Sequence, residues 1–328
     1  KGKIRLAVVA GLALLISTAP IEAAVAQDEV DSAEERFVSP NMLGGIGLLQ
    51  TRTARFGPDG LFHFGYSHAE PLKRIYMSVH IFPWMEATFR YTEFTDQMYS
   101  PFPWFSGYQT LKDRGADLKF RLLREGTYRP AVAVGLQDGL GTGIFASEYV
   151  VASKRFGDFD FSLGMAWGYL GSKGTIKNPL IRISDRFKSR AGEASTALGG
   201  TPTFLSFFGG ETVGLFGGLE YRTPIDGLTF KYEYDGRSYD ALSSSPYSLG
   251  FNFRPFPWID ISVGRERGNL NMVRVSLRAE LHDEGVPKFD PPPPPVEARP
   301  ALVELIGAAE ATAPATTRPP PDSPPTVP

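Results

Sequence analysis

The chain has 328 residues, with 34 lysines and arginines against 36 aspartates and glutamates, and a formal net charge of -2. This balance provides no basic patch of the kind that binds nucleic acid, so we expect no nucleic-acid partner. No cysteine occurs in the 328 residues, which excludes within them a disulfide framework, a thiolate metal site, a cysteine nucleophile and a lipid-modified amino-terminal cysteine.

The first 26 residues have the three parts of a secretory signal peptide. A basic head at residues 1–5 precedes an apolar run from Leu6 to Ile16 and an Ala-Val-Ala sequence at residues 24–26. The apolar run is shorter than a membrane-spanning helix requires, and a buried core helix is the alternative interpretation. We predict an exported protein whose mature chain begins near Gln27, with residues 27–44 as a short N-terminal segment.

Strands of alternating character are predicted from residue 45 to residue 284. In residues 158–169, apolar side chains such as Phe161 alternate with small or polar ones such as Ser162, and the pattern recurs at residues 228–235 and 273–280. Successive side chains of a strand point to opposite faces, so each strand would have one apolar face and one polar face.

These segments run to about ten residues, which is longer than most soluble strands and fits a membrane-spanning barrel. About thirteen strands are predicted, with centres near Gly47, Phe64, Val79, Phe89, Phe120, Val134, Val151, Leu163, Leu215, Phe230, Phe251, Ile261 and Val275. The predicted fold class is all-β: an antiparallel transmembrane β-barrel of about 12–14 strands, or the amino-terminal half of one.

The predicted connections alternate between tight turns and long loops, as in outer-membrane barrels. Gly157-Asp158 and Asp226-Gly227 are expected in tight turns, whereas residues 171–203 form a long polar connection that we expect outside the cell.

A Phe-Pro-Trp sequence occurs twice between predicted strands, at residues 82–84 and 256–258, and a third time at residues 102–104. Proline ends a strand because it lacks an N–H donor, and tryptophan is favoured at membrane interfaces. Ordinary turns of a soluble sheet are the alternative. The aromatics that we predict at the membrane interface are Trp84, Trp104, Trp167, Tyr169 and Trp258.

The composition changes after Leu281, because half of the 28 prolines lie in residues 287–328. Residues 285–328 are therefore predicted to be an extended, disordered linker. Barrels of this kind usually finish on an aromatic-ended strand, so we expect the chain to be part of a longer protein.

The sequence contains little that indicates catalysis. The four histidines, His63, His68, His80 and His282, lack metal-ligand spacing, and no serine lies in a G-x-S-x-G turn. We expect no metal, no cofactor and no enzymatic activity. His63 and His80 fall on the polar face of neighbouring predicted strands, where they would line a lumen.

Charged residues of both signs fall on the polar faces of the predicted strands. Paired carboxylates for glycoside hydrolysis are one interpretation, but their mixture with cations is more typical of a hydrated lumen. The residues predicted to line the lumen, and to form a path for polysaccharide, are Glu86, Arg90, Asp117, Lys119, Arg121, Lys231, Glu233, Arg254, Asp260, Arg274, Arg278 and Glu280.

Several stretches resemble the YjbH/GfcD family of exopolysaccharide-associated outer-membrane proteins: GIGLLQTRTARFGPDG at residues 45–60, FPWMEATFRYT at 82–92, KDRGADLKFRLL at 112–123, and most of residues 128–171. The resemblance implies a large outer-membrane barrel, encoded with partner proteins that make or export a capsule or another exopolysaccharide. Some relatives carry a lipoprotein cysteine that these 328 residues lack.

The sequence thus predicts an outer-membrane β-barrel of a Gram-negative bacterium that acts in exopolysaccharide secretion or surface assembly, through a passive polar lumen. Expected partners are outer-membrane lipids, the polysaccharide, and periplasmic or lipoprotein components of an export system. Three alternatives remain: a general porin for small solutes, a barrel enzyme acting on lipid or polysaccharide, and a structural barrel that docks partners through its proline-rich tail.

Overall fold

The computed structural model describes residues 38–139, 141–190, 207–238 and 245–281. The predicted signal peptide and the predicted proline-rich linker lie outside the described residues. No helix in the described part of the chain has the length and apolar character that a membrane span requires.

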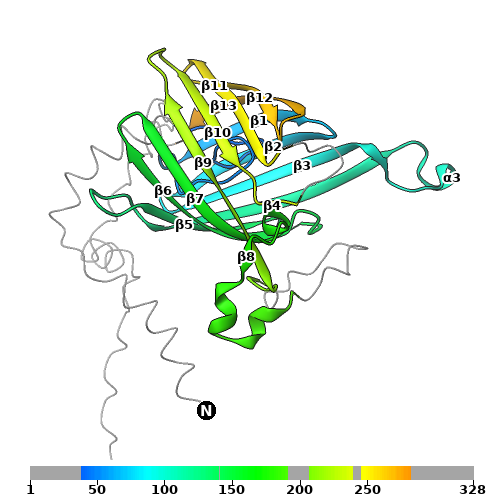
Figure 1. Ribbon diagram of the computed structural model, residues 1–328. Helices are drawn as coiled ribbons and strands as arrows, with labels where there is room; N and C mark the ends of the chain where they lie inside the picture. The colour runs from blue at the N-terminus through cyan, green and yellow to red at the C-terminus, as the bar shows by residue number, and fades with distance from the viewer. Residues whose placement is uncertain (1–37, 140, 191–206, 239–244, 282–328) are drawn as a thin grey trace, which may run out of the picture. The chain divides into compact units, whose positions relative to one another are not determined.

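Twelve antiparallel strands form a closed ring (Figure 1), and each pairs with the strands that precede and follow it in that ring. The last strand, β13, closes the ring by pairing with the first, β1. The strands are β1 (Leu61–Ala69), β2 (Leu72–Phe82), β3 (Met85–Met98), β4 (Thr110–Leu123), β5 (Ala131–Gln137), β6 (Ser147–Phe156), β7 (Phe159–Gly168), β9 (Thr212–Arg222), β10 (Leu228–Tyr234), β11 (Tyr247–Phe256), β12 (Ile259–Glu266) and β13 (Leu270–Glu280).

The predicted barrel is confirmed, and twelve of the thirteen predicted strand centres fall inside these strands. Because β1 and β13 pair along the whole of β1, the ring closes within this chain and the half-barrel alternative is wrong. The short strand β8 (Ile176–Lys177) pairs with the start of β9 outside the ring.

The outer face of the barrel is apolar, as the alternating pattern predicts. Its exposed side chains include Phe64, Tyr66, Ile75, Met77, Phe89, Tyr91, Phe159, Phe161, Leu163, Leu249, Phe251, Phe253, Val263, Val273, Val275 and Leu277. The residues between them on the same strands point into the lumen, where water or polar partners can satisfy them.

The two ends of the barrel differ in their connections. One end, which we call the short-turn end, holds the predicted tight turns at Gly157-Asp158 and Asp226-Gly227. Gly157 and Gly227 have the positive φ angles that such turns favour. At the other, the long-loop end, lie the connections after β3, β5, β7 and β10, including the three short 3₁₀ helices η1 (Tyr169–Gly171), η2 (Pro179–Arg182) and η3 (Asp185–Lys188). The chain enters β1 and leaves β13 at the short-turn end.

Two Phe-Pro-Trp turns repeat one geometry at the short-turn end. Phe82 stacks on Trp84 with ring centroids 5.2 Å apart, and Phe256 stacks on Trp258 at 5.5 Å. In each turn the proline follows the last residue of a strand, where its missing N–H costs no ladder hydrogen bond. The sequence repeat is therefore also a structural repeat.

The strand predicted near Gly47 is wrong. Residues 38–57 lie inside the ring as an irregular segment, almost entirely buried, with isolated bridges from Pro40 to Ile46 and from Gly47 to Arg52. We call residues 38–57 the plug. Its sequence has no apolar and polar alternation because all of its sides contact the lumen wall, so the property that identifies a barrel strand is missing.

Small residues in the wall make room for large side chains inside the barrel. A Cβ on Gly135 would lie 2.2 Å from the Tyr149 ring, and one on Gly164 would lie 2.3 Å from Phe216. Tyr149 and Phe216 belong to a buried cluster with Phe56 of the plug. The lumen is therefore packed as a core on this side.

Candidate functional site in the plugged lumen

Glu233 of β10 holds the plug by its backbone. Its carboxylate accepts hydrogen bonds from the N–H groups of Leu49, Gln50 and Thr51, at 2.9 to 3.0 Å, and from the Thr51 hydroxyl at 3.0 Å. Several donors aimed at one buried carboxylate satisfy both its charge and the plug's backbone. This predicted lumen residue is therefore a plug anchor.

Lys231 lies two residues before Glu233 and binds carbonyl groups of the plug backbone, whereas Glu233 binds its N–H groups. Its ammonium group donates to the carbonyl of Gly47 at 2.8 Å and to the Ser39 hydroxyl at 2.7 Å, and it forms an ion pair with Glu220 at 3.0 Å. β10 thus contributes a cation for plug carbonyls and an anion for plug N–H groups.

Glu86 of β3 and Lys119 of β4 form a second anchor. Their charged atoms lie 3.0 Å apart and both side chains are almost completely buried. Glu86 accepts from the N–H of Ile46 at 3.2 Å, while Lys119 donates to the carbonyl of Arg55 at 2.8 Å and lies over the Phe56 ring. A buried pair of this kind offsets its desolvation cost by such additional bonds.

Asp117 joins the plug to the wall near the middle of the lumen. Its carboxylate forms an ion pair with Arg52 of the plug at 2.9 Å and another with Arg90 of β3 at 2.6 Å. Arg52 also donates to the side-chain oxygen of Gln137 at 2.7 Å. The sequence prediction placed Arg90 and Asp117 in the lumen but missed Arg52, because Arg52 lies in the plug and not on a strand of the ring.

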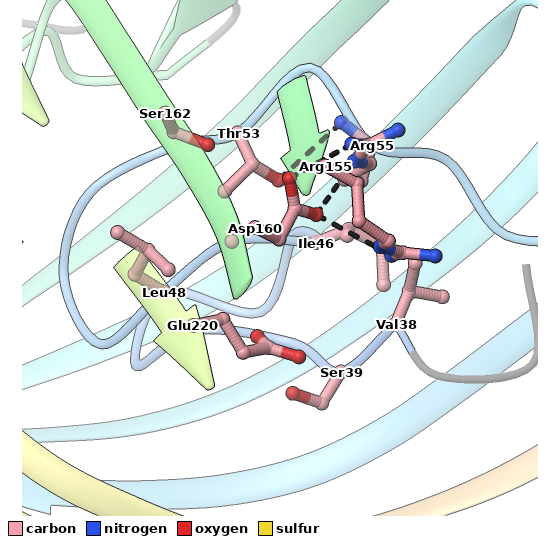
Figure 2. Close-up of a pocket in the computed structure, with 11 residues that line it drawn as sticks. Val38, Ser39, Ile46, Leu48, Thr53, Arg55, Arg155, Asp160, Ser162 and Glu220 are labelled. Atoms are coloured by element: carbon pink, nitrogen blue, oxygen red, sulfur yellow. Dashed lines mark hydrogen bonds and ion pairs between the residues drawn. The ribbon is translucent and has the colours of Figure 1, made fainter. Parts of the chain in front are cut away.

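Arg55 fastens the plug near the short-turn end (Figure 2). It forms a bidentate ion pair with Asp160, at 2.7 and 2.8 Å. A second ion pair joins Arg55 to Glu125 at 2.5 Å. Arg155 also reaches Asp160, at 3.4 Å. The space beside these residues offers about 10 Å³ to the centre of a water molecule, which is room for about one water.

Of the remaining predicted lumen residues, Arg274 lies at mid-barrel and the others lie toward the short-turn end. Arg254 pairs with Asp260 at 3.0 Å and donates to the Val38 carbonyl at 2.6 Å. Arg274 is buried and donates to Asn252, and Arg121 lies over the Phe56 ring. Arg278 pairs with Glu280 at 2.8 Å, and of the twelve only Glu280 is exposed, at the rim.

The two predicted lumen histidines are fully buried in the wall. Nε2 of His80 lies 3.0 Å from the N–H of Gly57 and 3.2 Å from Glu86, so His80 belongs to the plug contacts. Neither ring nitrogen of His63 is hydrogen-bonded to the described residues.

The five predicted interface aromatics fall into three groups. Trp84 and Trp258 are half-exposed at the short-turn end, and Trp104 is exposed at the tip of the β3–β4 hairpin, so the interface position of these three stays a prediction. Two predictions are wrong. Trp167 is only 2% exposed because Phe208, from the β7–β9 connection, packs against it, and Tyr169 turns inward to accept a hydrogen bond from Arg237.

Asp138, in the β5–β6 connection, gives a pH prediction. Burial, aided by the charges of Asp113 and Asp117, raises its pKa to about 6 from an ordinary 3.8. Because the folded pKa is raised, this carboxyl favours folding below pH 3.8, and that contribution is lost as the pH rises through about 6.

We therefore expect Asp138→Asn to raise the melting temperature of the barrel more at pH 7.5 than at pH 4. Asparagine tolerates the positive φ at this position and can still accept the hydrogen bond from Phe145 N. The measurement is the temperature at which the folded gel band disappears at each pH. Asp158→Asn, in an exposed turn, is the control, and an equal rise at both pH values would contradict the assignment.

Comparison with known proteins extends this picture. A model of the family described as "Exopolysaccharide biosynthesis protein YbjH" matches residues 39–313. The chain is also 42% identical over 251 residues to the protein of Escherichia coli (strain K12) named uncharacterized lipoprotein YjbH, covering 75% of this chain and 36% of that protein. The chain thus spans about a third of the length of this relative.

Solved structures with a similar arrangement include two porins. The KdgM porin is 10% identical, with a TM-score of 0.38 over 68% of this chain and 99% of the porin, and the NanC porin is 10% identical, with a TM-score of 0.35 over 67% and 99%. Both scores are low, and the barrel assignment rests on the strand pairing of this chain itself.

The matched residues include nearly the whole plug and every strand of the ring. The chain therefore belongs to the YjbH family of exopolysaccharide biosynthesis proteins.

Proposed function

We propose that this chain is a plugged outer-membrane barrel that acts, without catalysis, in the secretion or surface assembly of an exopolysaccharide. The observation that carries the proposal is a closed barrel with an apolar outer face and a charged lumen, in a chain of an exopolysaccharide family. The short-turn end would face the periplasm and the long-loop end the cell exterior, as in other outer-membrane barrels.

The chemistry of the lumen suits a sugar polymer once the plug has left. Lys231 and Glu233 now bind carbonyl and N–H groups of the plug backbone, and sugar hydroxyls are both donors and acceptors, so they could take the same places. A wall that holds its plug mainly by hydrogen bonds and ion pairs can exchange that plug for a hydrated polymer at lower cost than an apolar wall could.

The first test is deletion of the gene, with exopolysaccharide measured on the cells and in the medium. We expect both amounts to fall and the full-length gene to restore them. Unchanged amounts would overturn the proposal. His63→Gln in the restoring gene should leave polysaccharide unchanged with the barrel assembled, whereas loss of product would support the enzyme alternative.

A disulfide lock tests whether the polymer uses the lumen. A Cβ on Gly45 of the plug would lie 3.3 Å from Oγ1 of Thr88 in β3. In Thr88→Cys the sulfur would take about the place of Oγ1, so the two cysteines would be close enough for a disulfide bond. The Glu86 carboxylate would have to move aside. Because the 328 residues contain no other cysteine, Gly45→Cys with Thr88→Cys can form one defined bond.

If the polymer passes through the lumen, the oxidised double variant should fail to restore secretion, and a reducing agent should recover it. The two single-cysteine variants are the matched controls. Full restoration by the locked barrel would mean that the plug stays in place and that the protein acts in surface assembly.

The general porin is the weaker candidate. Besides the space beside Arg55, a second small space inside the barrel, next to Arg74 and Arg237, also offers about 10 Å³ to water centres. At the short-turn end a larger space offers about 730 Å³ to water centres and is lined by residues that include Thr229, Asn252, Arg254 and Arg278. Beyond this mouth, residues 38–57 occupy the lumen and are bonded to its wall. A porin would give steady conductance in planar bilayers and no secretion defect on deletion.

A further inference from the structure

The β3–β4 hairpin ends in an uncharged, aromatic segment that the plug and the lumen do not use. We call residues 98–110 the aromatic tip; it contains the one-turn helix α3 (Pro103–Ser106). Trp104 is 82% exposed, Phe105 73% and Tyr108 83%. In Figure 1 this hairpin projects beyond the neighbouring strands, with α3 at its far end. Large aromatic side chains displayed together in this way usually mark an interaction site.

The tip is held together by its own hydrogen bonds. Tyr99 N donates to the Gln109 carbonyl at 2.9 Å, and Gly107 N donates to the Pro103 carbonyl at 2.7 Å. The rings of Phe102 and Trp104 lie 4.7 Å apart. The aromatic rings are therefore presented by an ordered turn, which lowers the entropy cost of binding a ligand.

A charged collar separates the tip from the lipid-facing part of the barrel. On the outer face, the last apolar layer is Ile75 with Tyr91, which are paired in register. On β4 this layer is already charged, because Arg114 is the register partner of Tyr91, and the next positions outward are Lys73, Glu93 and Lys112. These four residues form the collar: Lys73, Glu93, Lys112 and Arg114. From Tyr91 to Met98 the strand would extend about 23 Å at 3.3 Å per residue.

This placement argues against the membrane as the partner of the tip. Interface aromatics lie at the edge of the apolar band, but the tip lies beyond the collar, on the side away from that band. The tip also carries no cation that would attract anionic lipid headgroups. Its neutral aromatic surface fits a ligand with neutral apolar faces in a watery setting.

We propose that the aromatic tip binds the secreted exopolysaccharide by stacking Trp104, Phe105 and Tyr108 against neutral hexopyranose units. A pyranose ring presents a face of C–H groups to the electron-rich face of an aromatic ring, and its hydroxyl edge can bond to the tyrosine hydroxyl. This inference rests on the proposed function, and it assigns that function a contact site on the long-loop side.

The test uses the full chain in phospholipid nanodiscs, and the probe is exopolysaccharide purified from the medium of the same cells. Trp104→Ala, Phe105→Ala and Tyr108→Ala together should weaken binding about tenfold or more, because three stacking faces are lost. Trp104→Phe with Tyr108→Phe should keep most of the affinity. The matched control is Trp84→Ala with Tyr128→Ala, which removes exposed aromatics at the short-turn end.

Three results would overturn the inference. They are unchanged affinity in the triple alanine variant, binding of purified lipopolysaccharide but not of exopolysaccharide, and a dimer of the full chain that the triple variant abolishes. A variant with Trp104 as its only tryptophan adds a membrane test: quenching by brominated lipids would place the tip in the bilayer, whereas quenching that requires the polysaccharide supports the inference.

Failure of this inference can be told apart from failure of the proposed function. If the chain does not bind exopolysaccharide while gene deletion still lowers secretion, the tip assignment alone is wrong. If the tip binds exopolysaccharide while deletion changes nothing, the tip assignment stands and the secretion role is wrong.

Discussion

Replacing Glu233 with alanine is expected to open the barrel. The change leaves three plug N–H groups and one hydroxyl without their acceptor, and each buried donor left unsatisfied costs about 1–3 kcal/mol. A total loss of about 3 kcal/mol or more favours the displaced plug by about a hundredfold. We expect channel openings in planar bilayers to become frequent in Glu233→Ala and to stay rare in the wild type.

Glu233→Gln refines this experiment because it keeps the shape of the side chain. Its amide retains one acceptor oxygen but directs an NH₂ group toward backbone N–H donors, so its conductance should lie between wild type and alanine. Glu211→Gln, at an exposed position before β9, is the control and should behave as wild type. Wild-type conductance in Glu233→Ala would show that this carboxylate does not hold the plug.

The second large effect is expected on stability, at the buried pair of Glu86 and Lys119. Lys119→Met leaves Glu86 without its cation, and it removes a donor from the carbonyls of Ile46 and Arg55. Breaking a buried ion pair from one side costs about 3–5 kcal/mol. The free energy of unfolding should fall by that amount in a urea titration in lipid vesicles, followed by the folded gel band.

A double-mutant cycle separates the pair from its surroundings. Glu86→Gln alone should also destabilise the barrel, but Lys119→Met with Glu86→Gln should cost less than the two single changes together, by about 1–3 kcal/mol. The control pair is Lys188 with Asp185, whose side chains are 56% and 83% exposed; a cycle there should give a coupling within about 0.5 kcal/mol. Strict additivity at Glu86 and Lys119 would mean that they do not act as a pair.

The barrel itself could be predicted from the sequence because its strands obey a local rule. Each strand would contact lipid on one face and faces the lumen on the other. The alternation of apolar and polar residues along residues 228–234 therefore predicts which side chains face outward. The same rule predicted that Lys231, Glu233, Glu86 and Lys119 point inward, and the structure places all four there.

The prediction that apolar strand residues are exposed on the outer face was wrong where a side chain from a distant part of the sequence covers such a residue. Trp167 continues the outward pattern of β7, but Phe208, about forty residues later in the chain, packs against it. The strand predicted near Gly47 was wrong for a different reason: the side chains of the plug are surrounded by wall residues on all sides, so they have no outer face. Its contacts join residues as far apart as Gln50 and Glu266, and no local pattern records them.

The residue pattern alone predicts the fold class, twelve of the strands, their inward and outward faces and the charged side chains that point into the lumen, because each of these follows from neighbours along one strand. Three facts are visible only in three dimensions: the ring closes within this chain, residues 38–57 lie inside it, and side chains on the predicted path for polysaccharide are bonded to the plug. Those facts depend on contacts between distant segments, where burial and charge pairing are settled by the whole ring and not by any single strand.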